Sequence, residues 1–467
     1  MTFNSLQFLI FYPIVAILYF VLPRRAAWPM LLIASYYFYM CYQAELVVLI
    51  LGTTLISWLA SHAIVRTERV GVRRLWLTAT LVVCFGVLFF YKYFNFLSGT
   101  VTGLINLFGA EASDFELNLL LPVGISFYTF QTLSYVIDVY RGDVKPERNF
   151  FFYALFVSFF PQLVAGPIER PGNLIPQLRE RHRWSSENAI KGAKHMLVGF
   201  FKKVCVADVI AVYVNSVYND VGSASAVAII IATALFAIQI YCDFSGYTDI
   251  AIGCARIMGI KLMQNFDHPY MATTIKGFWA RWHISLSGWF KDYLYIPLGG
   301  NRKRVLFNLF VVRFLTGFWH GAEWNFVVWG LFFAVLLILE KLWLYEKLQK
   351  SRVISRVYLL FAVMISFVIF NAADMKEALA YIGGMFGFGN VPLISAECVY
   401  YFRSYGVLIF GAIIGSTPIV KTMGSQFVNR FEKVTVVLRP IVLFVILGVC
   451  TAYLIDSSFN PFLYFRF

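Results

Sequence analysis

Long apolar runs recur along the whole chain and are separated by short polar stretches. A helix needs about 20 residues to cross the hydrocarbon core of a bilayer, whereas runs of 10–14 residues are typical of re-entrant segments. The pattern predicts an all-α polytopic membrane protein with roughly 11–13 transmembrane or re-entrant helices. The expected runs are 6–22, 28–42, 46–61, 75–98, 118–140, 196–216, 225–245, 305–318, 324–343, 354–371, 401–418 and 436–455. Because no repeat, low-complexity tract or long linker interrupts this pattern, we expect a single membrane domain over residues 1–467.

The composition excludes a water-soluble protein. Hydrophobic residues make up 60% of the chain and charged residues 14%, against about 25% charged residues in a soluble domain. The net charge of +14 indicates basic cytoplasmic loops that face anionic lipid or an anionic substrate. No zinc-finger or RNA-binding fingerprint is present, so nucleic acid is not an expected partner. The seven cysteines are an odd number, which argues against a disulfide scaffold.

The distribution of charge predicts the orientation. Arg24 and Arg25 follow the first apolar run, and no cleavable signal peptide precedes it. The positive-inside rule therefore places the N-terminus outside the cytoplasm. The stretches 168–203 and 256–304 each hold eight Lys or Arg residues and are therefore predicted to lie in the cytoplasm. The apolar run 150–166 lies between basic stretches, so we expect it to enter and leave the membrane by one face.

His320 is the strongest candidate for a functional residue. The other histidines in basic stretches, His62, His182 and His195, are expected to be solvated. His320 lies between two apolar runs, and the 14 residues of 305–318 rise only about 21 Å. The imidazole is therefore expected within the membrane at the top of a helix–turn–helix, where an ionisable group is by default a functional hypothesis. The alternative is a hydrogen-bonded histidine that ties two helices together.

Two further segments carry polar groups among apolar residues. Around His283, Trp279, Trp282 and Trp289 are spaced for one face of an interfacial amphipathic helix. The alternative is an aromatic belt with His283 as a polar filler, and the spacing does not separate the two. The segment 241–249 places Asp243 and Asp249 at the expected cytoplasmic end of a helix. These carboxylates could line a cavity, pair with Arg256 or cap the next helix, and capping is preferred for Asp249.

The absence of several motifs narrows the chemistry. The sequence contains no HExxH, P-loop, GxSxG or DxD-like element, which argues against a metalloprotease, an NTPase and a serine hydrolase. We expect no metal site and no bound cofactor. A neutral imidazole can act as the general base for a hydroxyl that attacks a thioester. An acyl-CoA donor is polyanionic, and the basic cytoplasmic loops could hold its phosphates.

Several motifs carry a resemblance to a known family. They are LLIASYYFYM at 31–40, LPVGISFYTFQTLSYVIDVYRG at 121–142, FVSFFPQLVAGPIERP at 156–171, DFSGYTDIAIG at 243–253, NFDHPYMATTIKGFWARWHISLSGWFKDYLYIPLGGNRK at 265–303, FLTGFWHGAEWNFVVWG at 314–330 and the C-terminal PFLYFRF. Together they resemble the membrane-bound O-acyltransferase (MBOAT) superfamily, in its AlgI-like branch of alginate and cell-wall polysaccharide O-acetyltransferases. DltB-like D-alanylation proteins are relatives of this branch.

The resemblance implies a fold and a set of site residues. The fold would be a ring of membrane helices around a central funnel. His320 matches the catalytic histidine of the family and His283 the second motif histidine. We expect His320 to be the general base or orienter, with His283 supporting it from the cytoplasmic side. Arg281, Trp282 and Asp243 are expected to contact the donor.

The resemblance also implies a pathway. The protein would move an acetyl group from cytoplasmic acetyl-CoA across the bacterial cytoplasmic (inner) membrane toward an extracytoplasmic polysaccharide. A partner SGNH-type transferase would complete the delivery. One alternative is D-alanyl transfer, as in DltB-like relatives. Another is a transporter of an acylated lipid or acyl intermediate, which predicts inverted repeats, and the sequence shows no such symmetry.

Overall fold

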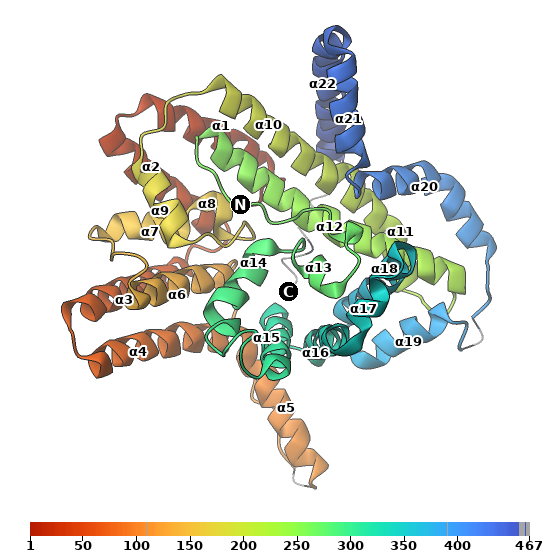
Figure 1. Cartoon of the computed structure of the whole chain (residues 1–467), viewed down its shortest axis with the longest axis horizontal. Helices are drawn as coiled ribbons and strands as arrows, with labels where there is room; N and C mark the ends of the chain where they lie inside the picture. Colours follow the sequence, from red (N-terminus) through yellow and green to blue (C-terminus); the bar gives the residue numbers. More distant parts are fainter. Residues whose placement is uncertain (110, 390, 457–462, 464–467) are drawn as a thin grey trace. The chain divides into compact units, whose positions relative to one another are not determined.

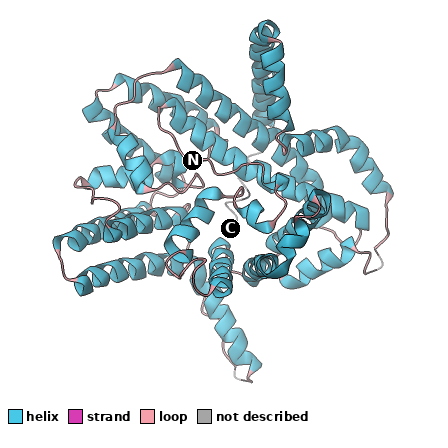
Figure 2. Cartoon of the chain, in the orientation of Figure 1, coloured by secondary structure: helices cyan, strands magenta, loops and turns pink. Residues whose placement is uncertain are grey.

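The computed structural model describes residues 1–109, 111–389, 391–456 and 463. The described residues form helices joined by loops, with no strand among them (Figure 2), which confirms the all-α prediction. The C-terminal motif PFLYFRF lies outside the described residues except for Leu463.

The helices group into two compact units. The first comprises Met1–Lys194, Ala251–Met263 and Gly288–Pro297, and the second comprises His195–Ile250, Gln264–Ser287 and Leu298–Phe467. The single membrane domain expected from the sequence stays a prediction. All the residues named as a candidate site in the sequence belong to the second unit.

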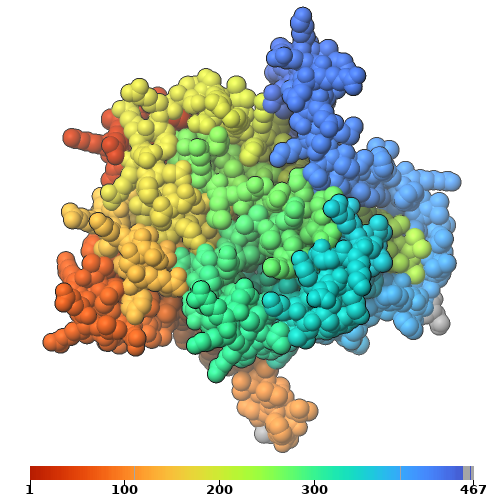
Figure 3. Space-filling model, viewed as in Figure 1, coloured from red at the N-terminus to blue at the C-terminus, as the bar shows by residue number. Residues whose placement is uncertain are grey.

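The first unit is built from the N-terminal helices. They are α1 (Leu6–Val21), α2 (Arg24–Met40), α3 (Val47–Arg66), α4 (Val70–Leu88), η1 (Phe89–Tyr93), α5 (Phe94–Leu107), α6 (Ile125–Arg141), α7 (Phe150–Ser158), α8 (Phe160–Leu163), α9 (Pro171–Arg179), most of α10 (Ser186–Phe200) and η4 (Lys291–Tyr295). Helices α3, α4 and α6 pack side by side (Figure 1). The apolar helix α5, drawn in orange, projects beyond the other helices of this unit (Figure 3). Only Thr102 of its residues is buried.

The apolar run 150–166 does not form one crossing helix. Helix α7 has nine residues, a rise of about 14 Å at 1.5 Å per residue, which is about half the hydrocarbon core. The chain breaks at Phe159 and continues as the four-residue helix α8. The Cα of Gly124 approaches this end so closely that a Cβ would lie 2.5 Å from the carbonyl oxygen of Leu163. These lengths fit a segment that turns back, and the face by which it enters stays a prediction.

The second unit holds the remaining helices. They are η2 (Phe201–Ala207), α11 (Asp208–Tyr218), most of α12 (Ala226–Ile257), η3 (Pro269–Met271), α13 (Ile275–Trp279), the start of α14 (Ile284–Phe290), α15 (Val305–His320), α16 (Trp324–Leu339), η5 (Glu340–Leu344), α17 (Tyr345–Leu348), α18 (Arg352–Asn371), α19 (Met375–Met385), α20 (Ala396–Gly415), α21 (Ile419–Arg430) and α22 (Glu432–Asp456). The short helix α15 packs along α16, which in turn contacts α18.

Every apolar run expected from the sequence corresponds to a helix, but fewer helices than expected have the length of a full crossing. In the described part of the chain, seven helical stretches are long and apolar enough to span a membrane. They are Val47–Arg66, Val70–Leu107, Ala226–Ile257, Trp324–Leu348, Arg352–Asn371, Ala396–Gly415 and Glu432–Ile455. Helices α1 and α15 are apolar but shorter, with 16 residues each.

One helix prediction is wrong in detail, and one of the two interpretations left open around His283 is excluded. Helix α12 was expected to end near residue 245, but it continues to Ile257, so Asp249 lies inside the helix and caps nothing. Its carboxylate pairs instead with Lys202, with 2.6 Å between Nζ and Oδ2. The three tryptophans around His283 do not share one amphipathic helix either. Trp279 ends α13 and Trp289 belongs to α14, because the chain turns between them at His283.

Candidate active site

His320 is held at the junction of two helices. It is the last residue of α15, and α16 begins four residues later at Trp324, so the predicted helix–turn–helix is present. The chain leaves α15 in an extended conformation at Gly321. A side chain at this glycine would overlap the ring of Phe326. The sequence Trp-His-Gly therefore both ends the helix and lets α16 fold back against it.

Three aromatic rings surround the imidazole of His320. The centroids of Trp319 and Trp329 each lie 4.9 Å from the centroid of His320, and that of Phe370 lies 5.5 Å away. All three rings stand edge-on to the imidazole, the arrangement that aromatic pairs prefer. They come from α15, α16 and α18, so the position of the imidazole depends on the packing of three helices. His320 is 6% exposed.

His283 is buried in a turn that depends on Asn265. The residue has φ +44°, a left-handed conformation that is uncommon outside glycine, and its exposed fraction is 0%. The Oδ1 atom of Asn265 lies 3.2 Å from Nδ1 of His283 and accepts hydrogen bonds from the backbone and the hydroxyl of Ser285. The ring of Phe244 stands edge-on at 4.8 Å. These contacts hold the imidazole in place.

The hydrogen bonds to Asn265 define the tautomer of His283. The backbone N–H of Ser285 donates to Oδ1 of Asn265, so this atom is the amide oxygen and only accepts. The Nδ1 atom of His283 must therefore carry the proton and donate it to Oδ1, which leaves the lone pair on Nε2. Burial lowers the pKa of His283 to about 3, so the ring is neutral at physiological pH.

The buried neutral ring makes the stability of the protein depend on pH. The unfolded chain takes up a proton at this residue below pH 6.5, the ordinary pKa, while the folded protein takes it up only near pH 3. The unfolded state therefore binds more protons in this window, and stability falls as the pH falls. Between pH 6.5 and 5 we expect a loss of about 2 kcal/mol from this group. Thermal unfolding at both pH values should show a smaller loss in His283→Gln than in the wild type, and equal losses would contradict the assignment.

Trp319 connects the two histidines. Its ring centroid lies 4.9 Å from that of His320 and 6.2 Å from that of His283. The two motifs are 37 positions apart in the sequence, and the fold brings both imidazoles to one indole. The sequence reasoning did not single out Trp319, nor did it single out Asn265. Trp319 could have been found from its position next to the candidate histidine. No feature of the sequence near His283 pointed to Asn265.

The three residues expected to contact the donor differ in their exposure and in the side chains that they contact. Arg281 is 42% exposed and pairs with Asp267 at 3.6 Å. Trp282 is buried in an aromatic cluster, stacked on Phe278 with 5.5 Å between centroids. Asp243 is 1% exposed and forms an ion pair with Lys203. Only Arg281 has a side chain accessible to a soluble donor, and the donor-binding role of all three stays a prediction.

Lys203 is the centre of a buried charge cluster that the sequence reasoning missed. Its Nζ atom lies 2.8 Å from Oδ1 of Asp243 and 2.9 Å from Oδ1 of Asp208. The other oxygen of Asp243, Oδ2, accepts a hydrogen bond of 2.8 Å from the backbone N–H of Leu463. The side chain of Lys203 is 1% exposed. The cluster joins η2, α11, α12 and Leu463 inside the unit.

The helix that carries His320 meets α16 through two glycines. A Cβ on Gly330 would lie 2.5 Å from the carbonyl oxygen of Arg313 and 3.0 Å from Cα of Gly317. The backbones of α15 and α16 are therefore in direct contact one turn before His320. Arg313 lies on the same helix, with its guanidinium 4.1 Å from the centroid of Trp279, a cation–π contact.

Adding one methyl group at this crossing is expected to displace His320. In Gly330→Ala the helices must separate, and overpacking of this kind costs about 1–3 kcal/mol. We expect a lower melting temperature together with a loss of acyl transfer, both measured on protein purified in the same detergent. Gly406→Ala in α20 is the matched control, because nothing lies within 4 Å of a Cβ at Gly406. Equal behaviour of the two variants would contradict the close crossing.

Comparison with known proteins identifies the family. Residues 146–373, which include both histidines, match the model of the membrane-bound O-acyltransferase family, MBOAT. The chain is 34% identical to the probable alginate O-acetylase AlgI of Pseudomonas putida over the whole of both chains. It is 32% identical to the peptidoglycan O-acetyltransferase of Helicobacter pylori, over 92% of this chain and 88% of that protein. It is 29% identical to the teichoic acid D-alanyltransferase of Bacillus subtilis, over 47% of this chain and 59% of that protein.

The apolar helices and these relatives define a multi-pass membrane enzyme that transfers acyl groups. The chain belongs to the membrane-bound O-acyltransferase family and is an O-acyltransferase. The resemblance found in the sequence motifs is thereby confirmed.

Proposed function

We propose that the protein transfers an acetyl group from cytoplasmic acetyl-CoA to an extracytoplasmic polysaccharide. The observation that carries this proposal is the meeting of His320 and His283 at the ring of Trp319, in a chain that matches an alginate O-acetylase along its entire length. The peptidoglycan O-acetyltransferase relative supports the same acyl group and a glycan acceptor.

In this proposal the two histidines have different roles in the reaction. His320 is 6% exposed and His283 is 0% exposed, and both ring nitrogens of His320 are buried, so a substrate has to displace neighbouring side chains to reach the His320 imidazole. In the proposal, His320 accepts the proton of the attacking hydroxyl, a role that contributes 10²- to 10⁴-fold in typical enzymes. His283 is a positioning residue, because it contacts Trp319 and its own orientation is fixed by Asn265.

The donor and the partner belong to the proposal as well. Acetyl-CoA carries several phosphates, and Arg281 offers an accessible guanidinium two residues before His283. Guanidinium groups bind phosphate through paired charge-assisted hydrogen bonds. The acetyl group would leave on the far side of the bacterial inner membrane, where an SGNH-type transferase passes it to the polysaccharide. The N-terminus is proposed to lie on that extracytoplasmic side, because Arg24 and Arg25 follow the first apolar helix.

The donor can be tested with purified protein. In proteoliposomes that contain the full chain, we expect label from [acetyl-¹⁴C]acetyl-CoA to reach an acceptor or partner supplied on the opposite side. His320→Ala in the same vesicles should transfer no label above the protein-free control. Transfer from a D-alanyl carrier protein, without transfer from acetyl-CoA, would instead support the D-alanylation seen in the name of the Bacillus subtilis relative. A protein that consumed neither donor would contradict the proposal.

A further inference from the structure

A basic hollow lies in the first unit, lined by residues to which the proposed function above assigns no role. Its volume is about 480 Å³, and it is enclosed by the end of α1, the start of α2, α7, and the segment from α9 to His182. This volume falls within the range of small-molecule sites. Four of its lining residues are arginines, namely Arg24, Arg25, Arg179 and Arg181.

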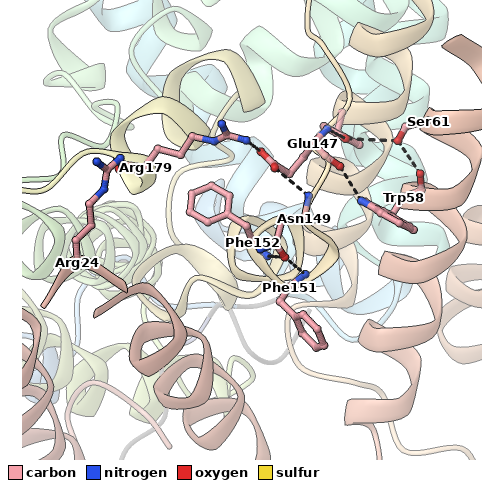
Figure 4. Close-up of polar contacts among 9 residues, drawn as sticks. Arg24, Trp58, Ser61, Glu147, Asn149, Phe151, Phe152 and Arg179 are labelled. Atoms are coloured by element: carbon pink, nitrogen blue, oxygen red, sulfur yellow. Dashed lines mark hydrogen bonds and ion pairs between the residues drawn. The ribbon is translucent and has the colours of Figure 1, made fainter. Parts of the chain in front are cut away.

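Two of these arginines are fixed by the protein itself. Arg179 forms an ion pair with Glu147 and lies over the ring of Phe152, with 5.4 Å between its guanidinium carbon and the ring centroid. Arg24 donates a hydrogen bond of 2.6 Å from Nη2 to the carbonyl oxygen of Arg179. Figure 4 shows Arg24, Arg179 and Glu147 in a row, with the ring of Phe152 below Arg179.

The carboxylate of Glu147 is already bound by Arg179 and by the backbone of Asn149. Its side chain is 4% exposed, and Oε1 accepts a hydrogen bond of 3.1 Å from the backbone of Asn149. Its backbone accepts from Nε1 of Trp58 at 2.7 Å and donates to the hydroxyl of Tyr135 at 2.7 Å (Figure 4). Glu147 therefore neutralises Arg179 and is held too firmly to turn toward another cation.

The remaining charge of the lining is positive. Within the described residues, neither Arg25 nor Arg181 has a side-chain hydrogen bond or an ion pair, and both are exposed. Glu180 is the second acidic residue that lines the hollow. The side chains of Arg25 and Arg181 are therefore available to bind an anion, and guanidinium groups are well suited to phosphate esters.

The inner wall of the hollow is apolar. Tyr19 and Leu22 contribute from the end of α1, and Trp28 of α2 stands edge-on to Phe152 with 5.7 Å between centroids. Arg24 and Arg25 follow directly on the apolar helix α1. Aromatic residues next to basic residues at the end of an apolar helix are typical of the membrane–water interface. A ligand seated here meets both cations and aromatic rings.

We propose that this hollow binds the phosphate-bearing headgroup of an anionic glycerophospholipid. Arg25 and Arg181 contact the phosphate, and the glycerol backbone and the first acyl carbons lie against Tyr19 and Trp28. Inorganic phosphate or pyrophosphate has the same charge, but it would leave the aromatic wall of the hollow without a partner. The site is a lipid site outside the acyl-transfer machinery, and it does not depend on which acyl donor the enzyme uses.

The proposal can be tested by the thermal unfolding of the full chain in a neutral detergent. Dihexanoyl-phosphatidylglycerol should raise the melting temperature in a saturable manner, because a ligand that binds only the folded state stabilises it. In Arg25→Gln/Arg181→Gln we expect the half-saturating lipid concentration to rise by about tenfold or more, a loss of about 1.4 kcal/mol or more in binding free energy, because the charge-assisted hydrogen bonds to the phosphate are removed. Phosphatidylglycerol that copurifies from the membrane, counted per chain by mass spectrometry, should fall in parallel.

A matched pair of arginines provides the control. Arg66 and Arg69 flank the end of α3 in the same unit and line no part of the hollow, so Arg66→Gln/Arg69→Gln removes the same charge. This variant should retain a half-saturating concentration within about twofold of the wild type, and a dihexanoyl-phosphatidylcholine titration should give no arginine-dependent shift. Equal losses in both double variants would overturn the proposal as nonspecific charge attraction. A saturable shift with coenzyme A or inorganic pyrophosphate that needs Arg25 and Arg181, without one for phosphatidylglycerol, would overturn the lipid in favour of a soluble phosphate.

Discussion

Replacing His320 by alanine is expected to abolish acyl transfer while leaving the protein in the membrane at its normal level. General acid–base catalysis contributes about 10²- to 10⁴-fold, so we expect glycan acylation in cells, and transfer in proteoliposomes, to fall at least 100-fold. The substitution removes the ring that Trp319, Trp329 and Phe370 enclose. The size of the loss therefore has to be compared with the amount of folded protein, measured by immunoblot and melting temperature.

Two further variants sharpen the result for His320. His195→Gln replaces an exposed histidine of the same unit, and its activity should match the wild type. His320→Gln keeps a polar side chain of similar reach but cannot accept and release a proton near neutral pH, so it should be as inactive as the alanine variant. Activity close to that of the wild type in either His320 variant would remove this residue from the mechanism.

His283 should behave differently from His320 because it is completely buried. If it acts by holding Trp319 and the turn at Asn265, His283→Gln should lower kcat and leave the KM for the donor nearly unchanged. Its kcat should also keep the pH profile of the wild type, since the group that titrates in the reaction is elsewhere. A changed profile would place His283 in the proton transfer itself.

Removing the ammonium group of Lys203 is expected to have the largest effect on stability. Lys203→Met leaves the carboxylates of Asp208 and Asp243 without their shared cation, and the latter is almost fully buried. Breaking a buried ion pair from one side costs about 3–5 kcal/mol, because a buried charge remains unpaired. We expect a strong drop in melting temperature and in the yield of folded protein.

The neighbouring lysine supplies the comparison for Lys203. Lys202 pairs with Asp249, but about a quarter of each side chain is exposed, so Lys202→Met should cost about 1 kcal/mol or less. Neutralising the whole cluster in Lys203→Met/Asp208→Asn/Asp243→Asn should recover much of the lost stability, since no unpaired charge then remains. Equal melting temperatures for Lys203→Met and Lys202→Met would show that the buried cluster contributes no more to stability than the partly exposed pair.

The features that were predicted correctly, the helices and the helix–turn–helix at His320, depend on residues that are close together in the sequence. The apolar runs predicted the helices, and the short run before His320, followed by Gly321, predicted the helix–turn–helix. The surroundings of His283 were not accessible in this way. Its partners Asn265 and Phe244 lie 18 and 39 positions away, and only the folded chain brings them together.

Charged residues show the same limit. Asp243 and Asp249 were placed at a helix end because polar residues usually interrupt an apolar run. Instead α12 continues through them, since Lys203 and Lys202 compensate their charges from another helix. A polar residue in an apolar run therefore marks the end of a helix only if no residue distant in the sequence pairs with it. The sequence alone does not show whether such a partner exists. For the same reason, sequence reasoning treated Asp243 as a donor contact without seeing its ion pair.

The glycine crossing of α15 and α16 has a consequence for which substitutions can displace His320. His320 is carried by a helix whose backbone is in direct contact with that of α16, so its location is set by this crossing. Sites built on the helices of a scaffold are held more precisely than sites on loops. We therefore expect substitutions in the outer helices and connections to displace His320 less than substitutions at this crossing.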